Sequence, residues 1–348
     1  MKLPFPPERI RSEQCPDCCS CGAHGEEIYR ALHDRLFDVP GKWNFRACPR
    51  ADCGLLWLDP LPLEEDLPKA YRAYYTHQYA AVPRSILKRL ARLLSDGYLA
   101  GKYGYKSGKI GFSRKCLGLL VHAAILWKPR LDFRLMHLRV QSGGRLLEVG
   151  CGNGEMMEIL REAGWRPEGI DFDPAAVTIA RARGLDVKLG TMESQRYDGD
   201  TFDAVTSSHT IEHLHDPARF LRECHRILKP GGRLAIVTPN AHSLSHRFFK
   251  QSWHGLDPPR HLYVFGIPSL QRLVPQAGFQ NIRIWTTIRG ADRLFAISRD
   301  IRLTGRHLWG SPQPFSVRIL GTIFEFAEYL LVTIGNPAGE EIVVTAEK

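Results

Sequence analysis

Three glycines alternate with other residues at Gly150, Gly152 and Gly154, and an acidic residue, Glu148, stands just before them. Glycine has no Cβ, so it allows backbone angles and close approaches that other residues block. A helix that begins directly after such a turn presents free N–H groups to a ligand lying against the main chain. The stretch Arg145 to Leu160 therefore predicts a strand, a glycine turn and a helix that together bind a nucleotide-type ligand.

An aspartate after the next predicted strand narrows the kind of ligand. Asp171 lies about 20 residues beyond Gly150, where its carboxylate can accept both hydroxyls of a ribose. The glycine spacing is G-x-G-x-G, whereas dinucleotide-binding proteins usually have G-x-G-x-x-G. Glu148 would oppose a phosphate, but it suits an ammonium or sulfonium group. The pattern favours a sulfonium nucleoside over a dinucleotide.

Histidines near the fourth predicted strand are the candidates for proton transfer. Methyl transfer from a sulfonium needs little covalent help, so the protein must align the nucleophile and, for a hydroxyl, remove its proton. His209 and His213 follow the fourth strand, and His261 lies further along the chain. In a sequence with 14 histidines, any single one is more often structural than catalytic.

Cysteines are concentrated near the N-terminus, where six of the nine precede residue 54. In a reducing compartment such a cluster favours a metal site over a disulfide framework. Cys18 and Cys21 form one close pair and Cys48 and Cys53 another, an arrangement by which four thiolates surround a tetrahedral Zn²⁺. The second pair is wider than the commonest spacing, and Cys15 is a rival first ligand. We expect one structural zinc, with a cluster of reduced cysteines as the alternative.

Strands and helices alternate from Gly144 onward, which predicts parallel strands joined by right-handed crossovers in a Rossmann-like, doubly wound α/β sheet. A helical insertion is expected at about 289–339, before the last strand. The chain is expected to divide into a cysteine-rich, zinc-ribbon-like module at 1–62, a helical basic connector at 63–142 and a ligand-binding domain at 143–348. The seven expected strands begin at Arg145, Pro167, Leu185, Phe202, Arg233, Ile282 and Ile342.

The net charge of +10 is unevenly placed, because between Arg84 and Lys115 nine basic residues face one acid, Asp96. Residues 86–94 predict a basic amphipathic helix, and the glycines from Gly97 onward predict its end. A second, apolar helix is expected at 116–127. The basic segment is expected to meet an acidic partner, such as an anionic membrane or a phosphate-bearing carrier; a solvated charged face is the alternative.

Composition is ordinary for a soluble globular protein, with 44% hydrophobic and 24% charged residues. The first residues carry prolines and charges where a secretory signal needs an apolar core. The apolar run 116–127 is too short to span a bilayer, and the run 319–334 contains Glu325 and Glu328. We therefore expect a cytoplasmic protein, with contact at the inner face of the membrane as a further expectation.

Several motifs at these positions resemble one family, the class I S-adenosylmethionine-dependent methyltransferases, and within it the bacterial group with an N-terminal cysteine-pair module. The resemblance covers nearly the whole chain. It rests on Leu147-Glu-Val-Gly-Cys-Gly-Asn-Gly154, Gly169-Ile-Asp171, Phe202-Asp-Ala-Val205, Ile211-Glu-His-Leu214, Leu228-Lys-Pro-Gly-Gly232, Pro258-Pro-Arg-His-Leu262 and Ala277-Gly-Phe279.

The resemblance implies a seven-stranded methyltransferase sheet with S-adenosylmethionine as the cofactor. It implies that Glu148 and the glycines hold the methionine portion and Asp171 the ribose. Phe172 and Met192 would flank the adenine, and Ser207 would complete the cofactor site. The family often has an acidic residue near the adenine amino group; Thr191 stands there in this sequence, and whether Thr191 or Glu193 takes that role stays open.

The same resemblance bears on the acceptor side. In similar quinone-type O-methyltransferases, an acidic residue and then Glu-His are associated with a divalent metal. Here His209 replaces that acidic residue, ahead of Glu212 and His213. We expect His209 or His213 to be the general base, with His261 as a third choice and metal binding as the alternative.

The sequence thus predicts an enzyme that methylates a small molecule, a sugar or a lipid-linked glycan intermediate; the last two acceptors come from the resemblance. The first alternative is an RNA-binding or RNA-modifying protein that grips RNA with the cysteine module and the basic segment. A second alternative is a cofactor-binding fold that has lost catalysis and serves as a partner subunit.

Overall fold

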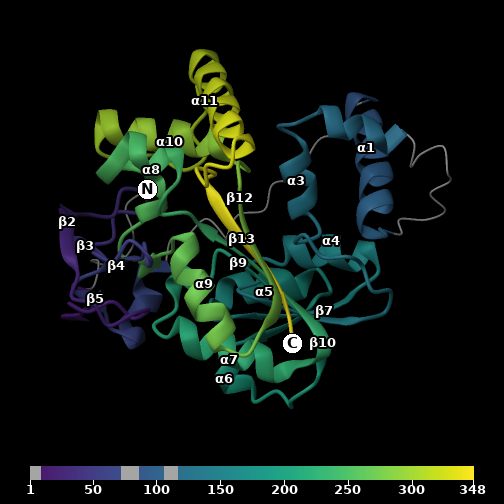
Figure 1. Ribbon diagram of the computed structural model, residues 1–348, viewed down its shortest axis with the longest axis horizontal. Helices are drawn as coiled ribbons and strands as arrows, with labels where there is room; N and C mark the ends of the chain where they lie inside the picture. The colour runs from purple at the N-terminus through teal and green to yellow at the C-terminus, as the bar shows by residue number, and fades with distance from the viewer. Residues whose placement is uncertain (1–8, 72–85, 106–116) are drawn as a thin grey trace.

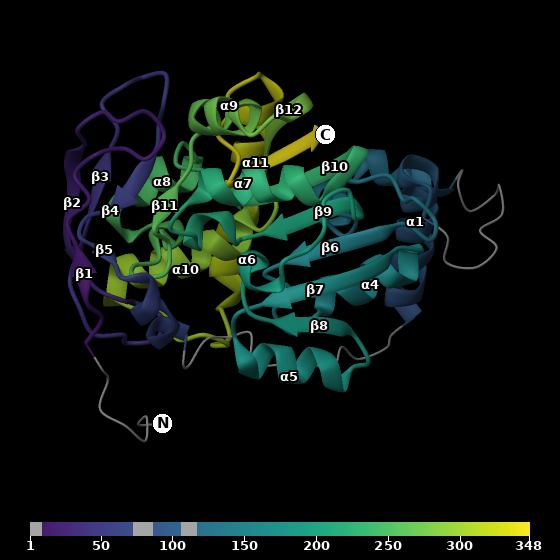
Figure 2. The ribbon, with the colours of Figure 1, turned by 90° about the horizontal axis from the view of Figure 1, so that it is seen from below.

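The computed structural model describes residues 9–71, 86–105 and 117–348, with the side chains of residues 86–90 excepted. A seven-stranded sheet forms its centre, in the order β12-β13-β10-β9-β6-β7-β8 (Figure 2). All seven predicted strands are present. They are β6 (Arg145–Val149), β7 (Arg166–Asp171), β8 (Asp186–Leu189), β9 (Phe202–Ser208), β10 (Leu228–Pro239), β12 (Gln280–Thr287) and β13 (Glu341–Glu347).

The last strand runs against its neighbours, because β13 pairs antiparallel with both β10 and β12. Thr287, which ends β12, lies opposite Glu341, which begins β13. The chain between them therefore leaves and re-enters the sheet on the same side. That side is the one on which the carboxyl ends of the parallel strands lie. The segment between consists of α10 (Ala291–Thr304) and α11 (Phe315–Thr333), so the predicted helical insertion is present.

Helices cover the sheet on both faces, as expected for right-handed crossovers (Figures 1 and 2). Two of these helices begin at an aspartate whose side chain caps the first turn. The Asp173 carboxylate accepts a hydrogen bond from the Ala175 N–H at 2.9 Å, and the Asp216 carboxylate accepts one from the Arg219 N–H at 2.8 Å. The helices are α4 (Glu155–Ala163), α5 (Pro174–Ala182), α6 (Met192–Gln195), α7 (Pro217–Ile227) and α9 (Ile267–Gln276).

A second sheet lies at the side of the molecule toward which the central strands point (Figure 2). It contains β2 (Glu26–Leu32), β3 (Trp43–Ala47) and β4 (Leu56–Leu58). Its fourth strand, β11 (Tyr263–Val264), pairs with β4 and comes from the C-terminal half of the chain. Two residues after β4, β5 (Leu61–Pro62) pairs with β1 (Ser12–Glu13), and both of its residues are buried.

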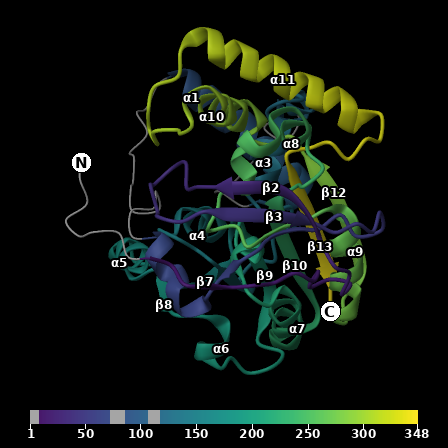
Figure 3. The ribbon, with the colours of Figure 1, turned by 90° about the vertical axis from the view of Figure 1, so that its left-hand side faces the viewer.

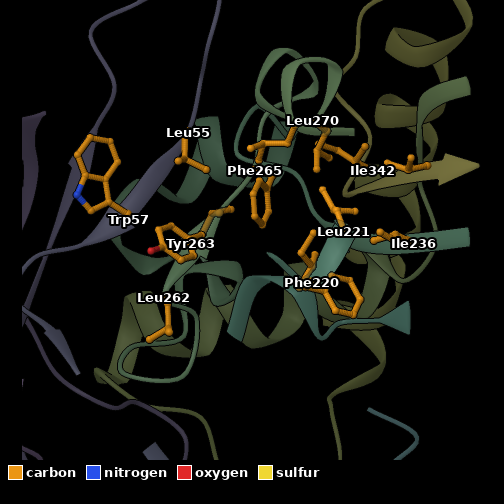
Figure 4. Packing of buried hydrophobic residues seen from close by; sticks show 14 of the residues in the cluster. Leu55, Trp57, Phe220, Leu221, Ile236, Leu262, Tyr263, Phe265, Leu270 and Ile342 are labelled. Atoms are coloured by element: carbon orange, nitrogen blue, oxygen red, sulfur yellow. The ribbon is translucent and has the colours of Figure 1, made fainter. Parts of the chain in front are cut away.

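One hydrophobic core joins the two sheets. It extends from Leu55 and Trp57 of the N-terminal sheet through Phe265 to Phe220 and Ile236 of the central sheet (Figure 4). Burial of such large side chains stabilises by roughly 1.5 to 3 kcal/mol each. The cysteine-rich part is therefore packed on the central domain through a shared apolar core.

The connector differs from the sequence prediction in two ways. Helix α1 (Ile86–Tyr103) does not end at Gly97, and the apolar run 116–127 is not one helix: its described part is a short 3₁₀ helix, Leu119–Ala123, followed by a turn. A Cβ on Gly118 would lie 2.2 Å from the backbone N of Tyr98. Gly118 thus permits the main chain to pass close to α1 at Gly97. From the sequence alone, a glycine at such a crossing looks the same as a glycine that ends a helix.

Two basic side chains of the predicted basic segment are described. Lys102 donates to both carboxylate oxygens of Asp132 at 2.9 Å, and Arg92 lies 3.9 Å from Asp96. The other basic side chains of that segment lie outside the described residues, so its acidic partner stays a prediction. No helix in the described ranges is long and apolar enough to cross a membrane.

Candidate active site

The glycine turn after β6 has the backbone geometry that the sequence predicted. Gly150, Gly152 and Gly154 all have positive φ, between 53° and 79°. A Cβ on Gly150 would lie 2.2 Å from Thr210 Oγ1, and one on Gly154 would lie 2.2 Å from a methyl carbon of Leu185. Both the dihedral angles and the close packing therefore require glycine at these two positions.

Asp171, at the end of β7, is held against this turn. Its carboxylate accepts hydrogen bonds from the Gly152 N–H at 2.7 Å and the Asp173 N–H at 2.9 Å. Burial raises the pKa of Asp171 above its ordinary value. The two backbone donors fix the carboxylate at the carboxyl end of β7. Its oxygens can still accept hydrogen bonds from the hydroxyls of a ribose.

Glu148 and Ser207 are buried polar groups beside the turn that lack partners among the described residues. Glu148 is 4% exposed, and no donor lies within hydrogen-bonding distance of its Oε2. Ser207, which lies opposite Val149 on the neighbouring strand, is fully buried with an unpartnered hydroxyl. Burial, and then the nearby Asp171, raise the pKa of Glu148 to about 8. Unpaired buried acceptors are costly, so these groups fit the cationic, methionine end of S-adenosylmethionine.

The side chains expected around the adenine lie at the ends of β7 and β8. Phe172 is 39% exposed, and its ring meets the Tyr71 ring edge to face at 4.9 Å. Met192 is buried at the start of α6. The Thr191 hydroxyl accepts a hydrogen bond from the Ser194 N–H at 3.4 Å as the N-terminal cap of α6, whereas Glu193 is exposed at the surface. Thr191 is thus engaged by its own helix.

Three of the residues singled out in the sequence converge after β9. Glu212 and His213, in the short helix η4 (Ile211–His213), and His261 each place one potential ligand atom within 4.8 Å of the others. His213 Nδ1 lies 2.8 Å from the Arg260 carbonyl oxygen, and His261 Nδ1 lies 2.8 Å from the Gly255 carbonyl oxygen. A carbonyl oxygen only accepts, so Nδ1 carries a proton in both rings, and Nε2 is the nitrogen left to face a ligand.

The charges of this cluster follow from its burial. Burial, and then the neighbouring His261, lower the pKa of His213 to about 4, so His213 is neutral near pH 7. Burial opposes ionisation of Glu212, but the contact with His209 and the other two histidines outweigh it and lower the Glu212 pKa to about 2. The cluster therefore combines an ionised carboxylate, Glu212, with a neutral imidazole, His213, that can accept a proton or a cation.

His209 lies beside the same cluster in a different charge state. Its Nε2 is 2.9 Å from Glu341 Oε1, and its Nδ1 is 3.3 Å from Glu212 Oε1. Burial lowers the His209 pKa, but the hydrogen bonds to Glu212 and Glu341 prevail and raise it to about 9. His209 is thus an imidazolium at neutral pH, without a lone pair for a substrate proton.

Several residues that hold the cluster were not foreseen in the sequence. The Tyr71 hydroxyl lies 2.9 Å from His213 Nδ1. Arg260 is fully buried and donates to both oxygens of Asp34, at 2.8 Å each, and to both oxygens of Asp257. Arg260 belongs to the Pro-Pro-Arg-His stretch that marked the family resemblance, and Asp257 directly precedes it. Nothing in the sequence pointed to Asp34, which is 226 residues away from Arg260.

The four predicted cysteine ligands form a separate cluster in the N-terminal sheet. The Cys18 and Cys53 sulfurs are 3.7 Å apart, those of Cys21 and Cys48 are 3.4 Å apart, and all four lie within 4.8 Å of one another. Tetrahedral Zn²⁺ with sulfur ligands at about 2.3 Å requires sulfurs roughly 3.8 Å apart, so the donor set fits zinc. Cys15 is not part of this group among the described residues.

Comparisons with known proteins agree with this geometry. Residues 122–284 match the family model described as a methyltransferase domain. A probable S-adenosylmethionine-dependent methyltransferase of Mycolicibacterium smegmatis is 32% identical over 160 residues, which are 44% of this chain and 59% of that protein. A ubiquinone biosynthesis O-methyltransferase of Xanthomonas oryzae is 37% identical over 118 residues, which are 32% of this chain and 49% of that protein.

A solved structure of an S-adenosylmethionine-dependent methyltransferase from Archaeoglobus fulgidus is 18% identical, with a TM-score of 0.43; the match covers 66% of this chain and 93% of that one. The chain spans only about half the length of the curated relatives it matches. Residues 122–284 thus match a methyltransferase domain, and the sheet order and the glycine turn agree with the class I S-adenosylmethionine-dependent methyltransferases. Strands β2, β3 and β4 of the N-terminal sheet and helices α10 and α11 lie outside the matched residues.

Proposed function

We propose that this protein transfers the methyl group of S-adenosylmethionine to a hydroxyl of a small-molecule acceptor. The observation that carries the proposal is the neutral His213, held beside the ionised Glu212 and His261, after the strand next to the glycine turn. The name of the Xanthomonas relative, a ubiquinone biosynthesis O-methyltransferase, supports oxygen as the acceptor atom. The family model and the relatives give no support to the RNA alternative.

In the proposed reaction, the sulfonium of the bound cofactor supplies an already activated methyl group. Glu148 would hold the ammonium of the cofactor and Asp171 its ribose, and Phe172 and Met192 would contact the adenine. His213 Nε2 accepts the acceptor's hydroxyl proton while the Arg260 carbonyl oxygen holds the opposite ring nitrogen. The carboxylate of Glu212 stabilises the imidazolium that forms.

The same three side chains suit a second role, which is to bind a divalent cation. One carboxylate and two imidazoles are a donor set for first-row transition metals, and the two backbone carbonyls orient the histidine rings for it. Such an ion would lower the pKa of an acceptor hydroxyl. Turnover that survives exhaustive chelation would favour the base, whereas loss of turnover restored by Mg²⁺, Mn²⁺ or Zn²⁺ would favour the metal.

A sugar or a lipid-linked glycan remains the other acceptor class. The cluster is suited to a hydroxyl group, and it does not determine which molecule bears that hydroxyl. The decisive experiment has two parts. Calorimetry should show binding of S-adenosylmethionine and of its demethylated product, with no preference for NAD. Labelled methyl transfer into quinol precursors, sugars and lipid-linked sugars should then identify the acceptor. Failure to bind the cofactor would refute the proposal.

We further propose that Cys18, Cys21, Cys48 and Cys53 hold one structural zinc. Four protein ligands leave no open coordination position, so the ion would stabilise the fold without taking part in the reaction. Elemental analysis of protein purified without chelator should find one zinc per chain. Cys48→Ser should lose the metal and Cys15→Ser should keep it. Protein without metal would contradict the assignment.

A further inference from the structure

Helix α11 is oriented opposite to an ordinary surface helix. A helix at the surface of a globular protein normally turns its apolar stripe inward and its charges outward. On α11 the buried positions are Val317, Gly321, Glu325 and Glu328. Seven large apolar side chains on α11 or directly after it are exposed instead, with exposed fractions between 43% and 79%: Phe315, Ile319, Leu320, Ile323, Phe326, Leu330 and Ile334.

These side chains form one continuous stripe. The steps from Phe315 through Ile319, Ile323 and Phe326 to Leu330 are four, four, three and four residues, which keeps them on one side of a helix. The helix has 19 residues and is therefore roughly 28 Å long at 1.5 Å per residue. Figures 1 and 3 show α11 at the outer boundary of the molecule, with no other element beyond it. A stripe of this length exceeds the scattered exposed apolar residues of a typical surface.

The packing under α11 explains why it stays in this orientation. A Cβ on Gly321 would lie 2.6 Å from the Asp292 carbonyl oxygen, so α10 and α11 are in close contact at this glycine. Glu325 Oε1 lies 2.8 Å from Arg130 Nη1, which in turn pairs with Asp292. The inner face is thus fixed by a close glycine contact and an ion pair, and the outer face is left to contact something else.

The charges around the stripe are of one sign. Arg302, Arg306 and Arg318 are exposed on α10, in the following turn and on α11. Every acidic residue between 291 and 334 is either buried or held by a cation. Asp292 pairs with Arg130 at 2.8 Å and Asp300 with His307 at 2.9 Å, while Glu325 and Glu328 are at most 2% exposed.

We propose that the outer face of α11 is a docking surface for an anionic lipid bilayer, on which the helix lies parallel to the membrane plane. An apolar stripe on an insertion that exposes arginines and no carboxylate matches the acyl boundary and the anionic headgroups of such a surface. The helix does not cross the bilayer, since no described helix can. Each arginine near an anionic surface strengthens binding about fivefold, which corresponds to roughly 1 kcal/mol.

The insertion that carries the docking surface begins and ends at the acceptor side of the active site. Arg289, just before α10, and Glu341, just after the insertion, hydrogen-bond to each other and contact His209. This proposal does not depend on methyl transfer, because it concerns binding alone.

The test is flotation of the full-length protein with vesicles of phosphatidylcholine alone or mixed with phosphatidylglycerol. We expect at least tenfold better recovery with the anionic vesicles, reduced by high salt. Ile323→Glu combined with Phe326→Glu should lower that recovery at least tenfold. The matched control, Ile28→Glu, adds a charge at a 39% exposed isoleucine on β2 and should leave recovery unchanged.

Unchanged circular dichroism and thermal midpoint would show that the α11 variant is folded. If it is not, Arg302→Glu combined with Arg306→Glu tests the same surface without touching the stripe. Three results would overturn the proposal: no recovery of the wild type on anionic vesicles, equal recovery of wild type and folded α11 variants, or a wild-type dimer that Ile323→Glu converts to a monomer. The last result would assign the face to a second copy of the chain.

Discussion

The two halves of the active site are built in different ways. The cofactor half consists of groups at the ends of adjacent strands, and its main contacts, such as that between Asp171 and the Gly152 N–H, join residues close in the chain. In the acceptor half, His213 is held by Tyr71 and by the Arg260 carbonyl oxygen, and Arg260 is anchored on Asp34 of the N-terminal part.

This difference shows what the N-terminal sheet contributes to the site. The cofactor half needs only the central sheet, since its geometry comes from strand ends and positive φ angles. The acceptor half needs the N-terminal part in place, because Asp34 and Tyr71 reach the cluster only when the two sheets share their core. We therefore expect damage to one half to leave the function of the other measurable.

The largest expected effect is on turnover. His213→Ala should lower the rate by about 10²- to 10⁴-fold, the usual contribution of a general base, and should leave cofactor affinity unchanged. Turnover measured with the identified acceptor tests the acceptor half, and calorimetry with S-adenosylmethionine tests the cofactor half. The control is His33→Ala, at an exposed histidine of the N-terminal part. A near-normal rate in the His213 variant would show that the cluster is not catalytic.

The second effect is on stability. Arg260→Ala leaves the buried Asp34 and Asp257 without their shared cation and should lower the free energy of unfolding by about 3 to 5 kcal/mol. Arg226→Ala, at a half-exposed arginine paired with Glu223, should cost at most about 1 kcal/mol. Denaturant titration measures both. If both variants lost equally little free energy of unfolding, the acceptor half would not depend on the ion pairs of Arg260.

The third effect belongs to the cofactor half. Asp171→Ala should weaken binding of S-adenosylmethionine roughly tenfold or more, because hydrogen bonds to a charged group contribute about 1.5 to 3 kcal/mol. Calorimetry on the variant and on Asp198→Ala, at an exposed aspartate, separates a local loss from a general charge effect. Unchanged affinity in the Asp171 variant would contradict the assignment of the ribose site.

The smallest effect is a pH dependence of cofactor binding. With a pKa of about 8, Glu148 is mostly protonated in the free protein at pH 7, and a bound ammonium favours its carboxylate form. Binding should therefore release a proton, and affinity should rise about fivefold from pH 7 to pH 8, as the ionised fraction does. Calorimetry in buffers of different ionisation enthalpy measures the released proton. A Glu148→Gln variant with the same pH dependence would assign the effect to another group.

Much of the fold and of the cofactor half was predictable from the sequence, because local features specify them. Hydrophobic runs between turn residues marked all seven central strands. The glycine spacing predicted the turn, since positive φ is a property of a single residue. The cysteine spacing likewise predicted which four sulfurs converge.

Tertiary structure alone decided the rest, because distant segments had to meet before those features existed. The entry of β11 into the N-terminal sheet and the Asp34–Arg260 pair join parts of the chain that no local pattern relates. The charge of His209 depends on Glu341, and the orientation of α11 depends on Gly321 and Arg130. The sequence by itself determined which residues could do chemistry, whereas long-range packing determined their protonation states and which face of α11 is exposed.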